Sequence, residues 1–208
     1  HPAVRMNCAQ RLWRIWQLSR EDFWTNVNSV LEKERNLGVL DHLCTNWFGR
    51  LLHEAPEWVE EHATRLVEAK SVDESRTRSL KDHLAAALAL LWFYKQRQKS
   101  RSVIEVWLHD PSLFKTEIAS VIHSSRGELE RFDKWDTTER KSAGHRCIAY
   151  LEEVLKVVNP KLINASEIQN PTEAQANVIR ACAELNHDVC MALYFATERI
   201  DGLNDELL

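Results

Sequence analysis

The stretch that decides the fold runs from residue 4 to residue 68 and contains one helical hairpin pattern twice, 36 residues apart. Residues 4–32 read VRMNCAQRLWRIWQLSREDFWTNVNSVLE, and residues 40–68 read LDHLCTNWFGRLLHEAPEWVEEHATRLVE. Their apolar positions coincide without a gap, as the pairs Val4 and Leu40, Cys8 and Cys44, and Phe23 and Val59 illustrate. A helix pair that recurs in this way must stack on its neighbours to bury its apolar face. The repetition therefore predicts an all-α protein built as an α-solenoid.

Eight or nine helices are expected along the whole chain, and the arrangement becomes more bundle-like toward the C-terminus. Ser19 is expected to cap a helix, Asn36 and Gly38 to form a turn, and Thr137 or Thr138 to cap a later helix. Asn159-Pro160 is expected to end that later helix, because the residue before a proline disfavours the helical conformation. Beyond residue 70 the predicted helices cover about 76–98, 103–109, 111 to about 132, the stretch from residue 138 up to Pro160, and 171–200. Residues 1–109 are expected to hold the repeats, and residues 110–208 to form a C-terminal helical region packed on them.

Composition indicates a soluble globular protein with 44% apolar and 28% charged residues. Only five glycines and five prolines occur, which disfavours an all-β fold with its frequent turns. Residues 1–104 carry 16 Lys and Arg against 13 Asp and Glu, and residues 105–208 carry 11 against 18. Neither half is strongly charged, so a dominant role at nucleic acids or membrane surfaces is disfavoured.

Five cysteines form an odd set, and most of them fall on apolar helix faces. Buried, reduced thiols in a cytoplasmic protein are the simplest interpretation. No stretch is long and apolar enough for a membrane helix. Because the chain opens on His1-Pro2 instead of Met, we expect it to be a fragment of a longer polypeptide.

The opening residues His1-Pro2-Ala3-Val4-Arg5, followed by Ala9 and Leu12, resemble the Pro-x-Val-Arg pattern of HEAT-like repeats. The second copy has Leu40-Asp41 in place of Val-Arg. The general pattern is also similar to the helical arrays that follow the NTPase module in large bacterial signalling and antiphage-type ATPases. This resemblance implies a sensor or regulatory array attached to an NTPase within a larger cytoplasmic protein.

No enzyme signature stands out, and neither a catalytic residue nor a cofactor or metal is expected. Glu184-x-x-His187 has the form used by di-iron bundles, but those sites need a second copy and further glutamates. Cys182 and Cys190 lie about 12 Å apart along a helix, which is too far for one zinc ion. A Gly-rich phosphate loop and a Gly-x-Ser-x-Gly elbow are both absent from the sequence.

Tryptophan provides the first candidate for partner binding, since eight residues of this type are many for 208 positions. Most are expected to fill the core or the contacts between repeats. Trp13, Trp24 and Trp58 lie beside the apolar faces of their helices, where an absent neighbour or a partner would cover them. Exposed tryptophans are favoured anchors in protein interfaces. We therefore predict these three residues as partner-binding positions.

A basic run provides the alternative, because Lys95, Arg97, Lys99 and Arg101 follow Trp92 and Tyr94. Clustered cations with neighbouring aromatic rings are typical of phosphate contacts and base stacking. The same residues also suit the solvated end of a helix, where cations complement the helix dipole. We thus expect protein–protein interaction or scaffolding, with partners in other proteins or in other domains of the same polypeptide. A HEAT-like nucleic-acid-binding module is the alternative.

Overall fold

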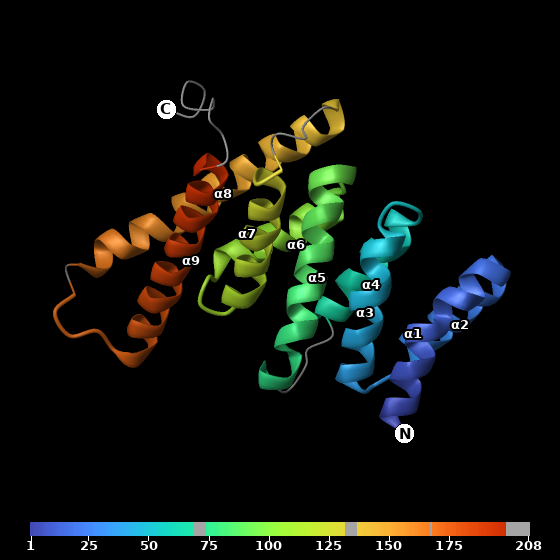
Figure 1. Cartoon of the computed structure of the whole chain (residues 1–208). Helices are drawn as coiled ribbons and strands as arrows, with labels where there is room; N and C mark the ends of the chain where they lie inside the picture. The colour runs from blue at the N-terminus through green and yellow to red at the C-terminus, as the bar shows by residue number, and fades with distance from the viewer. Residues whose placement is uncertain (69–73, 132–136, 167, 199–208) are drawn as a thin grey trace. The chain divides into compact units, whose positions relative to one another are not determined.

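The computed structural model describes residues 1–68, 74–131, 137–166 and 168–198, and within them it contains nine α-helices and no strand (Figure 1). The prediction of an all-α fold is therefore confirmed. The helices are α1 (Pro2–Leu18), α2 (Arg20–Lys33), α3 (Leu37–Leu51), α4 (Pro56–Glu68), α5 (Glu74–Lys95), α6 (Gln98–His109), α7 (Lys115–Leu129), α8 (Thr138–Ala165) and α9 (Glu173–Glu198).

Local capping explains where several helices begin. The side chains of Ser19, Asn36 and Thr137 accept hydrogen bonds from backbone N–H groups in the first turns of α2, α3 and α8. These bonds satisfy donors that have no partner inside the helix. Pro56 begins α4 at a position where its missing N–H is not needed. The predicted roles of Ser19 and Thr137 are thus confirmed. The turn expected at Asn36 and Gly38 is wrong for Gly38, because Asn36 is the N-cap of α3 and Gly38 lies in its first turn.

Three predicted helix boundaries are wrong by four residues or more, and the first is that of the helix expected from residue 103, which begins at Gln98. The helix expected from Pro111 begins only at Lys115, because Asp110 Oδ1 accepts hydrogen bonds from Ser112 Oγ at 2.7 Å and from the Leu113 N–H at 3.2 Å. These bonds hold residues 110–113 in a turn. The helix expected to end at Pro160 continues to Ala165 and contains that proline in its last third.

The described chain forms two compact units, His1–Ala87 and Leu88–Leu208, and the division falls inside α5. This division does not test the predicted boundary between repeats in residues 1–109 and a C-terminal helical region in residues 110–208, which stays a prediction. Within the first unit, α1 with α2 and α3 with α4 form successive hairpins. Its core contains Phe23, Val27, Leu43, Phe48 and Val59, all fully buried.

The second unit has its core between α7, α8 and α9, where Ile118, Val121, Tyr150, Leu151 and Leu185 are buried. Polar contacts tie these helices to the end of α5. The Tyr94 hydroxyl donates to Glu128 Oε2 on α7, and the Arg146 guanidinium on α8 donates from both Nε and Nη2 to the carbonyl oxygen of Phe93. Among the helices of the described residues, none is long and apolar enough to cross a membrane.

Candidate partner-binding groove

A groove of about 920 Å³ opens within the first unit, between α1 and α2. Its floor is apolar and comes from both helices: Cys8, Ala9, Leu12 and Ile15 on α1, and Val30 on α2. Leu12 and Ala9 are buried, whereas Ile15 and Val30 are half-buried and Cys8 is exposed. A concave, mostly apolar surface with a few polar groups at its edge is typical of a ligand or partner site.

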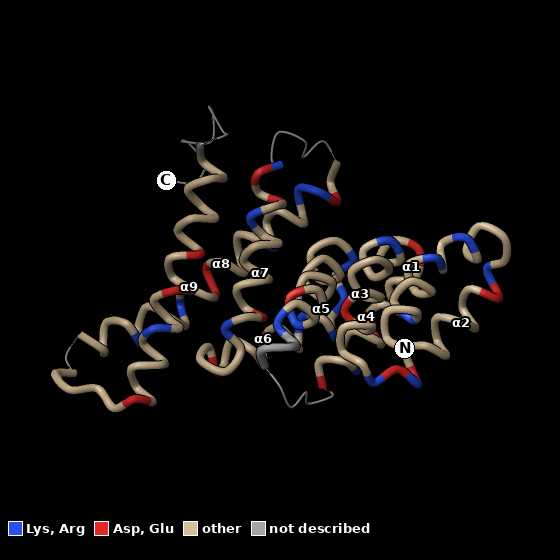
Figure 2. Tube along the Cα trace, turned by 60° about the horizontal axis from the view of Figure 1, so that its bottom comes forward, with Lys and Arg blue, Asp and Glu red and all other residues tan. Residues whose placement is uncertain are grey.

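The rim of the groove is basic. It carries five cationic side chains, Arg5, Arg11, Arg14, Lys33 and Arg35, against one carboxylate, Glu34. Figure 2 shows basic positions on both α1 and α2. Arg5, Arg11 and Arg14 follow one another at intervals of six and three residues along α1, and Lys33 and Arg35 lie at the end of α2 and just beyond it. The rim therefore carries an excess of positive charge.

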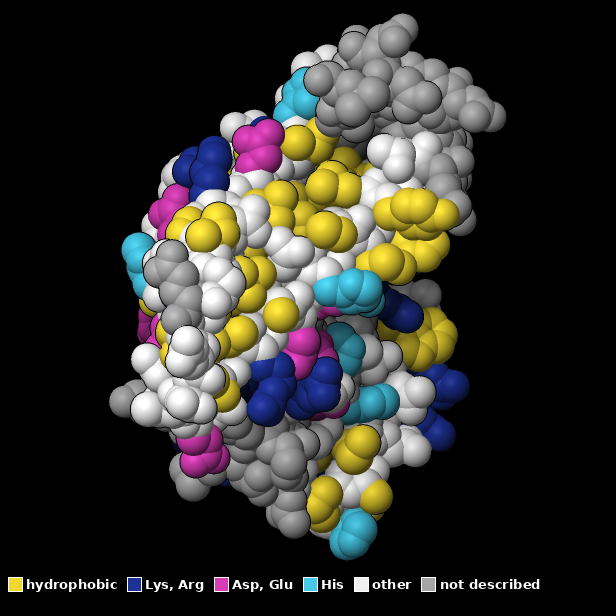
Figure 3. Space-filling view, turned by 90° about the vertical axis from the view of Figure 1, so that its left-hand side faces the viewer, with side chains coloured by type: hydrophobic (Ala, Val, Ile, Leu, Met, Phe, Trp, Pro, Cys, Tyr) yellow, Lys and Arg dark blue, Asp and Glu magenta, His cyan; other side chains and the backbone are white. Residues whose placement is uncertain are grey.

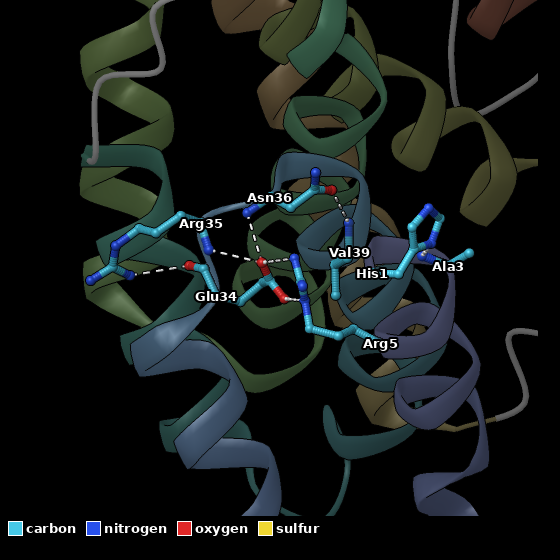
Figure 4. A network of polar contacts seen from close by, with 7 residues as sticks. All are labelled: His1, Ala3, Arg5, Glu34, Arg35, Asn36 and Val39. Atoms are coloured by element: carbon cyan, nitrogen blue, oxygen red, sulfur yellow. Dashed lines mark hydrogen bonds and ion pairs between the residues drawn. The ribbon is translucent and has the colours of Figure 1, made fainter.

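The single carboxylate of the rim is engaged inside the protein (Figure 4). Glu34 Oε2 accepts a hydrogen bond from Arg5 Nε at 2.6 Å, and Glu34 Oε1 accepts from Arg5 Nη2 at 3.2 Å. The backbone N–H groups of Arg35 and Asn36 also donate to Oε1, at 3.0 and 2.8 Å. Burial raises the pKa of Glu34, but these hydrogen bonds outweigh that effect and hold its pKa below its ordinary value.

Three cations of the rim, Arg11, Arg14 and Lys33, are available to a partner. In the part of the chain that the structure describes, Arg11 and Lys33 make no ion pair with a carboxylate. Arg14 has its guanidinium carbon 5.7 Å from the ring centroid of Trp13, which leaves its N–H groups at the surface. The charge that could meet a partner is therefore concentrated at Arg11, Arg14 and Lys33.

The three predicted tryptophans do not line this groove. Trp24 and Trp58 are half-buried with their rings 5.2 Å apart, and Trp58 Nε1 donates to Asn28 Oδ1 at 2.8 Å. Both belong to an aromatic cluster that also contains Trp16, Phe23, Trp47 and Phe48. Trp13 is 38% exposed on α1. The structure thus places Trp24 and Trp58 in an aromatic cluster and Trp13 beside Arg14, and the partner-binding role of all three stays a prediction.

The basic run is divided between two helices. Lys95 ends α5, Gln96 has a positive φ of 54°, and α6 begins at Gln98. Lys95 Nζ lies 3.2 Å from Glu139 Oε1, and Arg101 Nε lies 2.6 Å from Glu105 Oε1. Lys99 is exposed. Two of the four predicted phosphate contacts are therefore paired with carboxylates, and their proposed role with nucleic acid stays a prediction.

The remaining candidates for chemistry are metal-binding clusters and cysteine thiols among the described residues. These residues contain no cluster of three or more His, Cys, Asp or Glu side chains that could hold a metal ion. Burial raises the pKa of Cys44 and of Cys147, so both thiols stay protonated and are poor nucleophiles.

Three side chains of the first unit resemble a catalytic triad only in their residue types. Thr45 Oγ1 lies 2.9 Å from Nδ1 and 3.4 Å from Nε2 of the His83 ring, and Asp41 Oδ1 lies 2.8 Å from the same Nδ1. The Thr45 hydroxyl also donates to the backbone carbonyl oxygen of Asp41 at 2.7 Å. A triad needs the nucleophile and the carboxylate on opposite nitrogens. Thr45 and Asp41 both lie nearest to Nδ1, and the Thr45 hydroxyl donates to a backbone carbonyl, so the contact connects α3 to α5.

Comparison with known proteins adds no relative: no family model, no curated protein and no solved structure matches the chain. The candidate site thus depends on its own geometry. Sequence reasoning missed the groove, because its cations come from two helices. The signal that was available is the set of Arg11, Arg14, Lys33 and Arg35 on the two helices of one hairpin.

Proposed function

We propose that the protein is a protein-interaction module and that the groove between α1 and α2 is its docking site. In this proposal the hairpins are stacked repeats of a HEAT-like α-solenoid, which serves as a scaffold or sensor within a larger cytoplasmic protein. The observation that carries the proposal is the apolar floor of the groove, which stays open at the surface of the first hairpin.

A comparison of equivalent positions in the two hairpins supports this assignment. Val4 is 61% exposed, whereas its equivalent Leu40 is 5% exposed. Cys8 is exposed, whereas Cys44 is buried, and Ile15 is half-buried, whereas Leu51 is buried. The face that is buried in the second hairpin is thus accessible in the first. Accessible apolar surface of this kind suits the docking of another chain segment.

Apolar side chains also occur at the surface of the second unit. Figure 3 looks onto the side of α8 and α9 and shows apolar side chains gathered there, and Ile163 and Tyr194 on these helices are exposed. The hollow beside Leu155 and Pro160 on α8 is smaller, about 450 Å³. The groove between α1 and α2 is therefore the stronger candidate for a docking site.

Selection of binding peptides from a displayed random library tests the proposal. The selected peptides are then measured against the wild type, against Cys8→Trp, which fills the groove, and against Leu18→Trp. Leu18 lies on the same helix, is 87% exposed and does not line the groove. We expect Cys8→Trp to weaken binding by about tenfold or more, equivalent to about 1.4 kcal/mol. Leu18→Trp should leave the affinity unchanged.

Two results would overturn the docking site. One is a selection that yields no binder, and the other is a set of binders that Cys8→Trp and Leu18→Trp affect equally. Circular dichroism of each variant confirms that the helices are retained, so that a loss of binding is not a loss of fold.

A further inference from the structure

We propose that the segment docking in the groove is an acidic, amphipathic peptide whose aliphatic face lies on the floor and whose carboxylates meet Arg11, Arg14 and Lys33. This inference rests on the proposed function and adds the chemistry of the partner. It depends on two features together: the sign of the charge on the rim, and the aliphatic nature of the floor.

Charge complementarity argues for the acidic character of the partner. The cations of the rim outnumber its carboxylates by five to one, and that carboxylate, Glu34, is occupied by Arg5 and two backbone N–H groups. A neutral or basic segment would bring Arg11 and Lys33 out of water without a counter-charge, which is unfavourable. An acidic segment supplies the carboxylates that these residues lack.

The floor argues for a peptide and against nucleic acid. Its side chains are those of Cys8, Ala9, Leu12, Ile15 and Val30, and none of the residues lining the groove is aromatic. Single-stranded nucleic acid binds through bases stacked on aromatic rings, and duplex DNA presents a highly charged surface with no aliphatic face. Leucine, isoleucine or valine side chains of a peptide would fill such a floor.

The length of the groove fits a short helix. Its lining residues on α1 extend from Arg5 to Ile15, which corresponds to about 15 Å along the helix axis at a rise of about 1.5 Å per residue. A peptide helix of the same length has about three turns and presents aliphatic residues at i, i+3, i+4 and i+7. Acidic residues beside this stripe would reach Arg14 near one end of the groove and Lys33 near the other.

Three synthetic peptides test the inference. They share one aliphatic stripe and carry glutamate, glutamine or lysine at the flanking positions, and fluorescence anisotropy measures their affinity for the whole chain. We expect the glutamate peptide to bind at least about tenfold more tightly than the glutamine peptide. The lysine peptide should not bind. Raising the salt concentration should weaken the binding of the glutamate peptide more than that of the glutamine peptide, because salt screens the charges of the rim.

Charge reversal gives the sharpest control. The double variant Arg11→Glu/Lys33→Glu should no longer bind the glutamate peptide and should bind the lysine peptide instead. Misfolding cannot produce this exchange of preference. Arg180→Glu, an exposed position on α9, is the matched control and should bind the glutamate peptide as the wild type does.

The outcomes separate the two proposals. If the glutamate and glutamine peptides bind the wild type equally and Cys8→Trp weakens both, the preference for an acidic partner is wrong and the docking site remains supported. Binding of a single-stranded oligonucleotide that the double charge reversal abolishes, without binding of any peptide, would overturn both. Failure of the double variant to exchange its peptide preference would also overturn the preference for an acidic partner.

Discussion

At the scale of single residues, Glu34 connects the stability of the first unit to pH. Its carboxylate holds Arg5 and the backbone where α2 ends, and its pKa lies below its ordinary value. Because the folded-state pKa is depressed, the stabilisation is complete above the ordinary pKa, at about 4.3, and is lost as the pH falls through the lower folded-state pKa. Glu34→Gln should thus lower the free energy of unfolding by about 1–2 kcal/mol at pH 7.

The pH dependence of this difference is the decisive measurement. Urea unfolding of the wild type and Glu34→Gln should give free energies that converge as the pH falls from 5 toward 3. Glu32→Gln, at an exposed position in the last turn of α2, should show a much smaller difference at every pH. A difference between wild type and Glu34→Gln that does not change with pH would contradict a stabilising role for the charge.

Arg146 should stabilise the second unit through the end of α5. The carbonyl oxygen of Trp92 accepts the N–H of Gln96, and the carbonyl oxygen of Phe93 accepts the Arg146 guanidinium. Carbonyl groups in the last turn of a helix otherwise lack a partner. Arg146→Met keeps the aliphatic stem but removes the donors, so we expect a loss of about 1–3 kcal/mol. The midpoint of urea unfolding measures this loss, and Arg180→Met should change stability by less than about 0.5 kcal/mol.

At the scale of helices, Pro160 should weaken the helix that contains it. Proline has no N–H to donate to the carbonyl oxygen four residues earlier, which belongs to Lys156. Pro160→Ala restores this donor at an exposed position, and we expect thermal unfolding to show a gain of about 1–2 kcal/mol. Pro56→Ala is the matched control, because Pro56 begins α4 and lacks no hydrogen bond there. A gain for Pro56→Ala but not for Pro160→Ala would contradict this account.

The helix caps and the end of α8 show what the sequence could and could not predict. Caps such as Ser19 and Thr137 were predictable, because their hydrogen bonds reach only three residues along the chain. The end of α8 was not, since the restriction that Pro160 imposes on Asn159 is a local preference that packing overrides. Asn186 Nδ2 on α9 donates to Asn159 Oδ1 at 2.7 Å, and Val154 and Val158 are buried. Contacts between helices therefore keep α8 helical beyond its proline.

The candidate site was less predictable than the helices for the same reason. The basic run from Lys95 to Arg101 is a candidate in the sequence because its cations lie close together along the chain. In the folded protein, however, a carboxylate from a distant segment, Glu139, pairs with Lys95. Arg11 and Lys33 are 22 residues apart, and only the packing of α1 on α2 brings them to one groove. Cations that are close in the sequence predict a high local charge. A docking site depends instead on which of these charges remain unpaired after folding.

At the scale of the whole molecule, α5 should couple the two units. The division between them falls at Ala87–Leu88, and this helix runs continuously from Glu74 to Lys95 through that point. A continuous helix transmits unfolding, because its hydrogen bonds propagate cooperatively along the chain. Hydrogen exchange at increasing urea concentration should therefore show peptides from α1–α4 and from α6–α9 of the wild type becoming exposed at one common midpoint.

Ala86→Pro should remove this coupling, because proline disrupts the helical conformation and one hydrogen bond at the division. We expect two separate midpoints, one for each unit. Gln98→Pro is the control, since Gln98 is the first residue of α6 and Arg97 before it already has an extended conformation, with φ −68° and ψ 116°. Two midpoints already present in the wild type would show that the units unfold independently. The continuous α-solenoid that we propose requires one common midpoint, so the experiment also tests that proposal.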